Sequence, residues 1–408
     1  MFSGLFGGNS SKNGSNGRGS ENGKSNGQQL SSEFMSFLST IASFSGDLAS
    51  MTCPSFLLSG MSLLEYSAFW VDHPELFAAI TESDSESERM LAAARWFIST
   101  LRGSYTTEGR AATRGESEKK PFNPPLGEQF FATWPAVGDL GETRLMAEQV
   151  SHHPPVSAFW GINEKAGVEL VGHSGQKTRF RAPYVYVDQA GHVVITLKKR
   201  NSEQYLVTLP HLFIKNLLTG SPYTEVCDTN WIVSSTGWTA RFSYSTRNLF
   251  SGTNHSFKCT VSNPAGKPTH EIEGTWASVS EVVDLATNEK KLFLDAAKPG
   301  PSQMQLKPLE EQGPMESHRL WHKVSEALRN KNYSLATREK TLIEEEQRAA
   351  RRKRAETGEI WEPKYFKNVP EDEPFKKLVE KLSTGDRPLD YGQGRWLLKE
   401  EPATANGH

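Results

Sequence analysis

The chain has 408 residues, and 36% of them are hydrophobic, so it can bury the large core of one oversized domain or of two to three ordinary ones. Its formal net charge of −2 gives no overall attraction to nucleic acid. Three widely spaced cysteines without a CxxC motif argue against a disulfide framework or a cysteine zinc site, and they favour a reducing compartment. No signal peptide or run of roughly 18 apolar residues is present, so membrane contact is expected to be peripheral.

The N-terminal part divides into two predicted segments. Residues 1–28 are rich in Gly, Ser and Asn and are expected to be disordered. Residues 29–52 are expected to form an amphipathic helix, because apolar side chains recur at helical spacing opposite a face of hydroxyl groups. Two interpretations of this helix stay open: ordinary packing on the core, or sensing of loosely packed membranes. The apolar side chains are Phe34, Phe37, Leu38, Ile41 and Phe44.

The middle of the chain changes from a helical to a strand period. Residues 53–118 are expected to form a helical layer. From about Gly127 the period becomes two for roughly 170 residues, with turn signals between short apolar runs. Strands in such number, without helices between them, predict an antiparallel sheet over residues 119–312 that closes into a barrel or splits into a sandwich. A wide barrel can hold an apolar ligand cavity.

The C-terminal part, residues 313–408, returns to a helical period. We expect one helix over residues 315–330 and a longer one from residue 333 to 356 that ends at Gly358. The long helix carries Lys340, Glu344 and Arg348 at intervals of four residues, which places them in one stripe. On spacing alone, two intrahelical ion pairs are the favoured interpretation.

The segment EQVSHHPP, residues 148–155, holds two adjacent histidines before a double proline. Metal binding fits poorly, because consecutive residues of a strand project to opposite faces. Catalysis fits less well, since no GxSxG elbow accompanies Ser151 and His152. Two interpretations remain: a turn in which Pro154 holds His153 extended, or an anion site formed by imidazole donors. An anion site requires other cations nearby, and Lys119, Lys120 and the helical stripe can supply them.

These residues resemble a known family. The segment EQVSHHPP is identical to the signature of the oxysterol-binding protein family, and KPFNPPLGE, KPLEEQGPMESHRLW and the Lys-Glu-Arg stripe are similar to three further blocks of it. The resemblance runs from about Ser31 to Phe366, so the chain is expected to be a short, lipid-binding-domain-only member of fungal type. It implies an α+β fold: a large, near-closed antiparallel β-barrel around an apolar lipid tunnel, with an N-terminal lid helix, an N-terminal helical layer and C-terminal helices.

The resemblance also implies a function. Family members exchange phosphatidylinositol 4-phosphate and, in the same pocket, a sterol between membranes, so we expect a cytoplasmic monomer that associates peripherally with Golgi and endoplasmic reticulum membranes. No enzyme activity, cofactor, metal or nucleic-acid partner is expected. The alternatives are a lipid sensor without net transport, or an exchanger whose second lipid is a phospholipid such as phosphatidylserine. A hydrolase is a weaker alternative, since no nucleophile is evident.

Site residues are carried over from the family by position. The phosphoinositide headgroup would contact His152, His153, Lys120, Asn123, Lys340, Glu344 and Arg348. The sterol would contact Trp70, Ser104, Tyr105, Ser174 and Gln189, and the lid would be formed by Phe34, Phe37, Leu38, Ile41 and Phe44. Ser104 and Ser174 stand where the sterol-binding pattern has larger amides, so these contacts would pass through water or the second lipid would differ.

Overall fold

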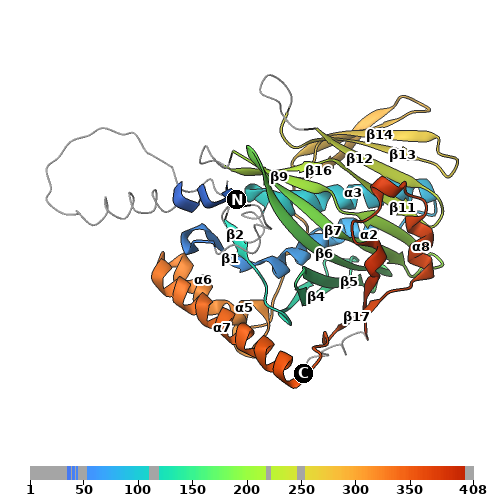
Figure 1. Cartoon of the computed structure of the whole chain (residues 1–408). Helices are drawn as coiled ribbons and strands as arrows, with labels where there is room; N and C mark the ends of the chain where they lie inside the picture. The colour runs from blue at the N-terminus through green and yellow to red at the C-terminus, as the bar shows by residue number, and fades with distance from the viewer. Residues whose placement is uncertain are drawn as a thin grey trace, which may run out of the picture.

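The computed structural model describes residues 35–37, 39–41, 43–44, 53–109, 119–216, 222–245 and 253–399. A 14-stranded antiparallel sheet forms its centre (Figure 1). The order along the sheet is β16-β15-β14-β13-β12-β11-β8-β7-β6-β5-β4-β3, with β9 paired to β7 and β10 to β9. The strands are β3 Gln129–Trp134, β4 Thr143–His152, β5 Pro155–Asn163, β6 Val168–Arg181, β7 Tyr184–Leu197, β8 Glu203–Thr208, β9 His211–Lys215, β10 Tyr223–Cys227, β11 Thr229–Ser234, β12 Thr239–Ser245, β13 Ser256–Ser262, β14 Pro268–Thr275, β15 Val279–Asp284 and β16 Lys290–Asp295.

The period of two predicted from the sequence is confirmed by this sheet. Burial alternates along β3, and neighbouring strands pair over long registers, as β6 and β7 do from Val168↔Leu197 to Arg181↔Tyr184. Within the described residues, the end strands β3 and β16 do not pair with each other, so the sheet keeps two edges. The structure thus shows a large antiparallel sheet with helices, and closure into a barrel stays a prediction.

The two faces of the sheet bury different cores. We call inner the face that carries Leu170 and Ile195, because these side chains join the largest core cluster. Helix α3, Glu86–Tyr105, belongs to this core through Trp96 and Phe97, and Ser85 caps its first turn by accepting from the amide of Glu88 at 3.4 Å. The opposite, outer face carries residues such as Val194, which pack against the C-terminal elements.

The N-terminal elements lie beside the inner core. Residues 35–37, 39–41 and 43 are helical, and the side chains of Phe37 and Ile41 pack against the main core cluster. Of the other three predicted lid residues, Phe44 is exposed, and Phe34 and Leu38 lie outside the described residues. The elements that follow are η3 Ser55–Leu57, β1 Leu58–Ser62, η4 Leu63–Trp70 and α2 Pro74–Ala79, and β1 pairs in parallel with β2 Lys120–Phe122. Strand β1 was not predicted.

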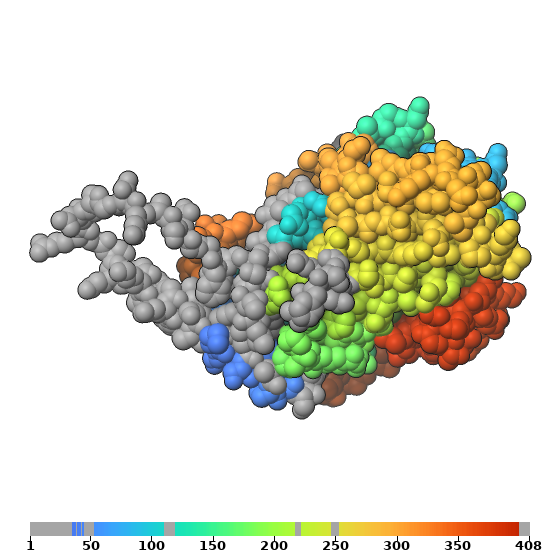
Figure 2. Space-filling model, turned by 90° about the horizontal axis from the view of Figure 1, so that it is seen from above, coloured from blue at the N-terminus to red at the C-terminus, as the bar shows by residue number. Residues whose placement is uncertain are grey.

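The C-terminal elements surround the sheet from two sides. The long helix α7 runs along one flank beside α6 (Figure 1), and it begins and ends close to the predicted positions, with Gly358 in the left-handed conformation. Beyond it, α8 packs Phe375 on the outer face against Val194 of β7, Leu206 of β8 and Val233 of β11, and Figure 2 shows the red C-terminal residues at one side of the molecule. The elements are η6 Leu309–Glu311, α5 Ser317–Leu320, α6 His322–Arg329, α7 Tyr333–Thr357, β17 Phe366–Val369, α8 Glu373–Val379, η7 Thr384–Asp386, η8 Tyr391–Gln393 and β18 Arg395–Leu398.

No helix among the described residues combines the length and hydrophobicity needed to cross a membrane.

Candidate functional site

The turn between β4 and β5 holds the two adjacent histidines together. Strand β4 ends at His152, which pairs with Pro155 at the start of β5, and His153 lies in the turn between them. The two imidazole rings are 4.6 Å apart between centroids and inclined by 61°. The expectation that the two side chains project to opposite faces is therefore wrong, because His153 is a turn residue and not a strand residue. Both rings are exposed and can reach a common ligand.

The other polar side chains of the signature stiffen this turn. The amide Nε2 of Gln149 donates to the carbonyl of Ser151 at 2.8 Å, and its Oε1 accepts from Ser157 Oγ at 2.6 Å. The hydroxyl of Ser151 donates across the turn to the carbonyl of Pro154 at 2.7 Å. These bonds tie β4 to β5 and restrict the backbone that carries the histidines, as an anion site requires.

Glu148, the first residue of the signature, anchors a distant segment. Its buried carboxylate accepts the backbone N–H groups of Lys364 at 2.7 Å and Tyr365 at 2.9 Å. Burial raises the pKa of this carboxyl, and the backbone donors oppose the shift. Because residues 364 and 365 follow α7, Glu148 fixes the exit of α7 against the strand that ends at His152. Nothing in the local sequence indicated this role.

Helix α7 contributes a stripe of charges to the same region. Lys340 forms an ion pair with Glu344, and Arg348 Nη2 lies 3.5 Å from the other carboxylate oxygen of Glu344. The intrahelical pairing favoured from spacing is thus confirmed. The Lys340 side chain is only 15% exposed, whereas that of Arg348 is 56% exposed. The stripe therefore runs from a half-buried ammonium group to a guanidinium group in solvent.

Strand β2 brings a further cation toward α7. The ammonium of Lys120 donates to Asn123 Oδ1 at 2.9 Å. Burial lowers the pKa of Lys120; the nearby charge of Lys340 lowers it further, whereas Glu344 acts in the opposite direction. Two ammonium groups that repel each other and interact with a single carboxylate leave a local excess of positive charge. Lys119, by contrast, lies with its Nζ 5.9 Å from the centre of the Tyr333 ring.

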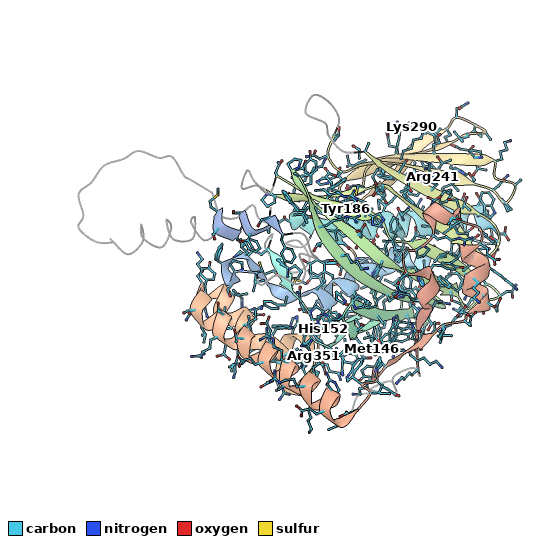
Figure 3. All side chains as sticks on the ribbon, in the orientation of Figure 1. Met146, His152, Tyr186, Arg241, Lys290 and Arg351 are labelled. Atoms are coloured by element: carbon cyan, nitrogen blue, oxygen red, sulfur yellow. The ribbon has the colours of Figure 1, made fainter. Side chains whose placement is uncertain are left out.

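The histidines lie at the end of this stripe. Desolvation lowers the pKa of His152, the neighbouring His153 and Arg351 lower it further, and the carbonyl of Pro124 and Glu344 oppose the shift. Arg351 Nη1 is 3.4 Å from His153 Nε2, and Figure 3 shows Arg351 beside His152. Arg351 was not predicted as a site residue, although it follows Arg348 by one helical turn. We refer to this group of residues as the basic cluster; it consists of Lys120, Asn123, His152, His153, Lys340, Glu344, Arg348 and Arg351.

A second predicted set lies on the inner face. The hydroxyl of Tyr105, at the end of α3, donates to Gln189 Oε1 at 3.3 Å and accepts from Gln189 Nε2 at 3.0 Å. Burial raises the pKa of Tyr105 to about 12, so the phenol stays neutral. The register of β6 and β7 pairs Gln176 with Gln189 and Ser174 with Gly191, which places Ser174 on the same face as Gln189.

The remaining two predicted residues, Trp70 and Ser104, have other partners. Trp70, at the end of η4, stacks on Phe159 of β5 with 5.7 Å between ring centroids, and its carbonyl accepts from the indole of Trp96. The hydroxyl of Ser104 donates to the carbonyl of Thr100 one turn earlier in α3, at 2.8 Å. The inner side thus carries both aromatic and neutral polar groups, a combination that suits an apolar molecule with one hydroxyl.

Comparisons with known proteins find similar sequences and similar folds. The sequence profile described as oxysterol-binding protein matches residues 36–326 and 324–396. The protein kes1 of Schizosaccharomyces pombe is 41% identical over 357 residues, which cover 86% of this chain and 90% of the relative. The Osh1 ORD domain in complex with ergosterol is 21% identical, with a TM-score of 0.68 and coverage of 89% of this chain and 85% of the other. The Osh3 ORD of Saccharomyces cerevisiae in complex with PI(4)P is 22% identical, with a TM-score of 0.64 and coverage of 82% and 87%.

Proposed function

The chain belongs to the oxysterol-binding protein family, and on that premise we propose that it is a lipid transfer protein that exchanges phosphatidylinositol 4-phosphate for a sterol between membranes. The observation that carries the proposal is the basic cluster, in which β2, the β4–β5 turn and α7 place cations near one another. The structural neighbours in complex with ergosterol and with PI(4)P support the two lipid classes.

The headgroup phosphate would bind at the basic cluster. A unit charge about 4 Å from a phosphate contributes roughly 4 kcal/mol at an effective dielectric of 20, so several cations together favour a multiply charged inositol phosphate. Lys120 and Lys340 repel each other in the free protein, and a phosphate between them would relieve this repulsion. In this proposal Glu344 orients Lys340 and Arg348 toward the headgroup, and His152 and His153 donate N–H groups to it.

The acyl chains or the sterol would occupy the inner side of the sheet. Here the proposal includes the near-closed barrel around an apolar tunnel, with the large inner core as its wall. Tyr105 and Gln189 would bind the sterol hydroxyl, and Trp70, Ser104 and Ser174 would complete this end of the tunnel. A second lipid other than a sterol, such as phosphatidylserine, would use the same apolar space.

The N-terminal helix would serve as the lid. Phe37 and Ile41 already pack on the inner core, whereas the side chains of Met35 and Phe44 are 61% and 36% exposed. In the proposed cycle the lid of residues 29–52 opens at a membrane, one lipid leaves and another enters. Burying several hundred Å² of apolar lipid surface contributes on the order of 10 kcal/mol, which offsets extraction from the bilayer.

The proposed cycle assigns a role to each segment of the chain. We propose a tail over residues 1–28, the lid over 29–52, a helical layer over 53–118, the barrel over 119–312 and a C-terminal subdomain over 313–408. The protein would act as a cytoplasmic monomer at Golgi and endoplasmic reticulum membranes, without enzymatic activity. Because both lipids share one cavity, transport of each would follow the gradient of the other.

The test is donor-to-acceptor transfer of a fluorescent sterol by protein at amounts far below the lipid. We expect each protein molecule to transfer many sterols, and transfer to accelerate when the acceptor liposomes contain phosphatidylinositol 4-phosphate. Acceptor liposomes with an equal charge supplied by phosphatidylglycerol, which is not one of the proposed ligands, are the control for electrostatic attraction alone. A single round of extraction without net transfer would contradict exchange and favour a lipid sensor.

A further inference from the structure

A second histidine pair lies on the outer face of the sheet, away from the basic cluster. His173 of β6 and His192 of β7 are direct partners in the strand register, so their side chains share one face. Their ring centroids are 4.7 Å apart. His192 also stacks on Phe375 of α8 at 4.2 Å, which shows that the C-terminal elements cover this pair.

The C-terminal segment adds a carboxylate to the pair. Asp390, directly before η8, places its Oδ2 2.6 Å from His173 Nε2. Its other oxygen, Oδ1, accepts the backbone N–H of Gly191 at 3.0 Å, which fixes the orientation of the carboxylate. The side chains of His173 and Asp390 are 3% and 12% exposed, and His192 is 1% exposed. Three chain segments thus enclose a group of potential metal ligands.

Two nitrogen atoms of this group lack partners. Within the described residues, the Nδ1 atoms of both His173 and His192 are buried and have no hydrogen-bond partner. An unsatisfied buried polar atom costs about 1–3 kcal/mol, so two such atoms in adjacent side chains point to a missing ligand. A neutral imidazole offers one nitrogen lone pair, and a metal ion binds such a lone pair.

We propose that His173, His192 and Asp390 bind a divalent transition metal ion of the zinc type. One ligand atom from each residue lies within 4.8 Å of the others, so small side-chain shifts bring all three to one ion. Two imidazoles and one carboxylate are a donor set that zinc accepts in proteins, with a water molecule as the fourth ligand. The amide of Gly191 would act behind Asp390 as an orienting donor.

The surrounding charges permit such an ion. The positive charge of Arg395 helps to lower the pKa of His192. The Nη1 atom of Arg395 lies 3.0 Å from Asp372 Oδ2, so this carboxylate offsets the charge of Arg395. The carboxylate of Asp390 then favours a positive ion. Because Asp390 lies near the end of the described chain and the histidines lie in the centre of the sheet, the ion would fasten the C-terminal segment to the outer face.

The experiment uses the full chain, stripped with a chelator and titrated with Zn²⁺, and with Co²⁺ as a spectroscopic probe. We expect about one equivalent of either ion per chain, visible Co²⁺ absorption of a site with nitrogen and oxygen ligands, and a higher melting temperature with Zn²⁺. His192→Gln should weaken binding by roughly tenfold or more. The matched control is His270→Gln, whose imidazole lies 3.9 Å from Asp284 on strands far from this group, and it should leave the affinity unchanged.

The wild-type measurements decide the proposal even where a variant fails to fold. Absence of a stoichiometric ion, together with an unchanged melting temperature, would show that His173 and Asp390 form an ordinary hydrogen-bonded pair, and it would overturn the proposal. Equal binding by wild type and His192→Gln, with His192→Gln folded as judged by circular dichroism, would also overturn it.

Discussion

The two histidine pairs of this protein lie on one sheet and have opposite surroundings. His152 and His153 are exposed, and the charged groups around them are mainly cations: Arg351 is 3.4 Å from His153. His173 and His192 are buried, and a carboxylate contacts the first of them. Burial lowers the pKa of His192 well below its usual range, which keeps this imidazole neutral.

The comparison shows that the neighbours, and not the residue type, determine what a histidine pair can bind. An exposed pair among cations can donate its N–H groups to an anion. A buried pair beside a carboxylate offers lone pairs to a cation. Glu148 lies four residues before His152 and accepts the backbone N–H groups of residues 364 and 365. These residues belong to the stretch of chain that leads from α7 to the segment with Asp390, so Glu148 links the regions of the two histidine pairs.

The largest expected effect is on the exposed pair. His152→Ala combined with His153→Ala should weaken extraction of phosphatidylinositol 4-phosphate from liposomes by about 100-fold or more, because two charge-assisted hydrogen bonds of roughly 1.5–3 kcal/mol each are lost. Sterol extraction should stay unchanged. His322→Ala, an exposed histidine on α6, is the matched control. Equal loss of both lipids, or loss of neither, would remove the distinction between headgroup and sterol contacts.

An intermediate effect is expected from pH. Desolvation and the charges of His153 and Arg351 lower the pKa of His152 in the free protein, while Glu344 opposes them, and a bound phosphate would raise it. Binding then takes up a proton, so affinity should fall as pH rises between the free and the bound pKa, by roughly tenfold from about pH 6 to pH 8.

The control for this pH effect is His152→Asn. The phosphate itself gains negative charge as pH rises through about 6, which acts in the opposite direction, and this contribution is common to both proteins. The difference between wild type and variant therefore isolates the imidazole. Parallel pH profiles, measured by liposome extraction, would show that His152 does not take up the proton.

The smallest effect is expected where neither charge nor histidine is involved. Tyr105→Phe removes the hydroxyl that bonds to Gln189, and a neutral hydrogen bond contributes about 0.5–1.5 kcal/mol. Sterol affinity should fall by roughly threefold to tenfold, while phosphoinositide affinity stays the same. Tyr184→Phe, at the start of β7, is the control. A fall in phosphoinositide affinity alone would place Tyr105 with the headgroup instead.

Local patterns were sufficient to predict much of the fold. The period of two predicted the sheet, and the helical period with Gly358 predicted α7 to within a residue at its end. In the case against a metal, strand alternation was extended one residue too far, into the turn at His153, whereas the alternative interpretation did place a turn there. Strand β1 was missed because its pairing with β2 joins segments about 60 residues apart in the sequence, and such pairing leaves no local period.

The candidate site was predictable to a lesser extent. The spacing of Lys340, Glu344 and Arg348 indicated a stripe, but only the fold places Lys120 beside it. The roles of Glu148 and Asp390 depend on contacts between residues some 200 positions apart. No periodicity encodes such contacts, so they could be found only in the structure.

The central claim is that one cavity holds either a sterol or a phosphoinositide. Native mass spectrometry of the wild-type chain, equilibrated with liposomes that contain both lipids, tests it most directly. We expect each protein molecule to carry one lipid, and the sterol-bound fraction to fall as the phosphatidylinositol 4-phosphate-bound fraction rises. A population that carries both lipids at once would contradict the account.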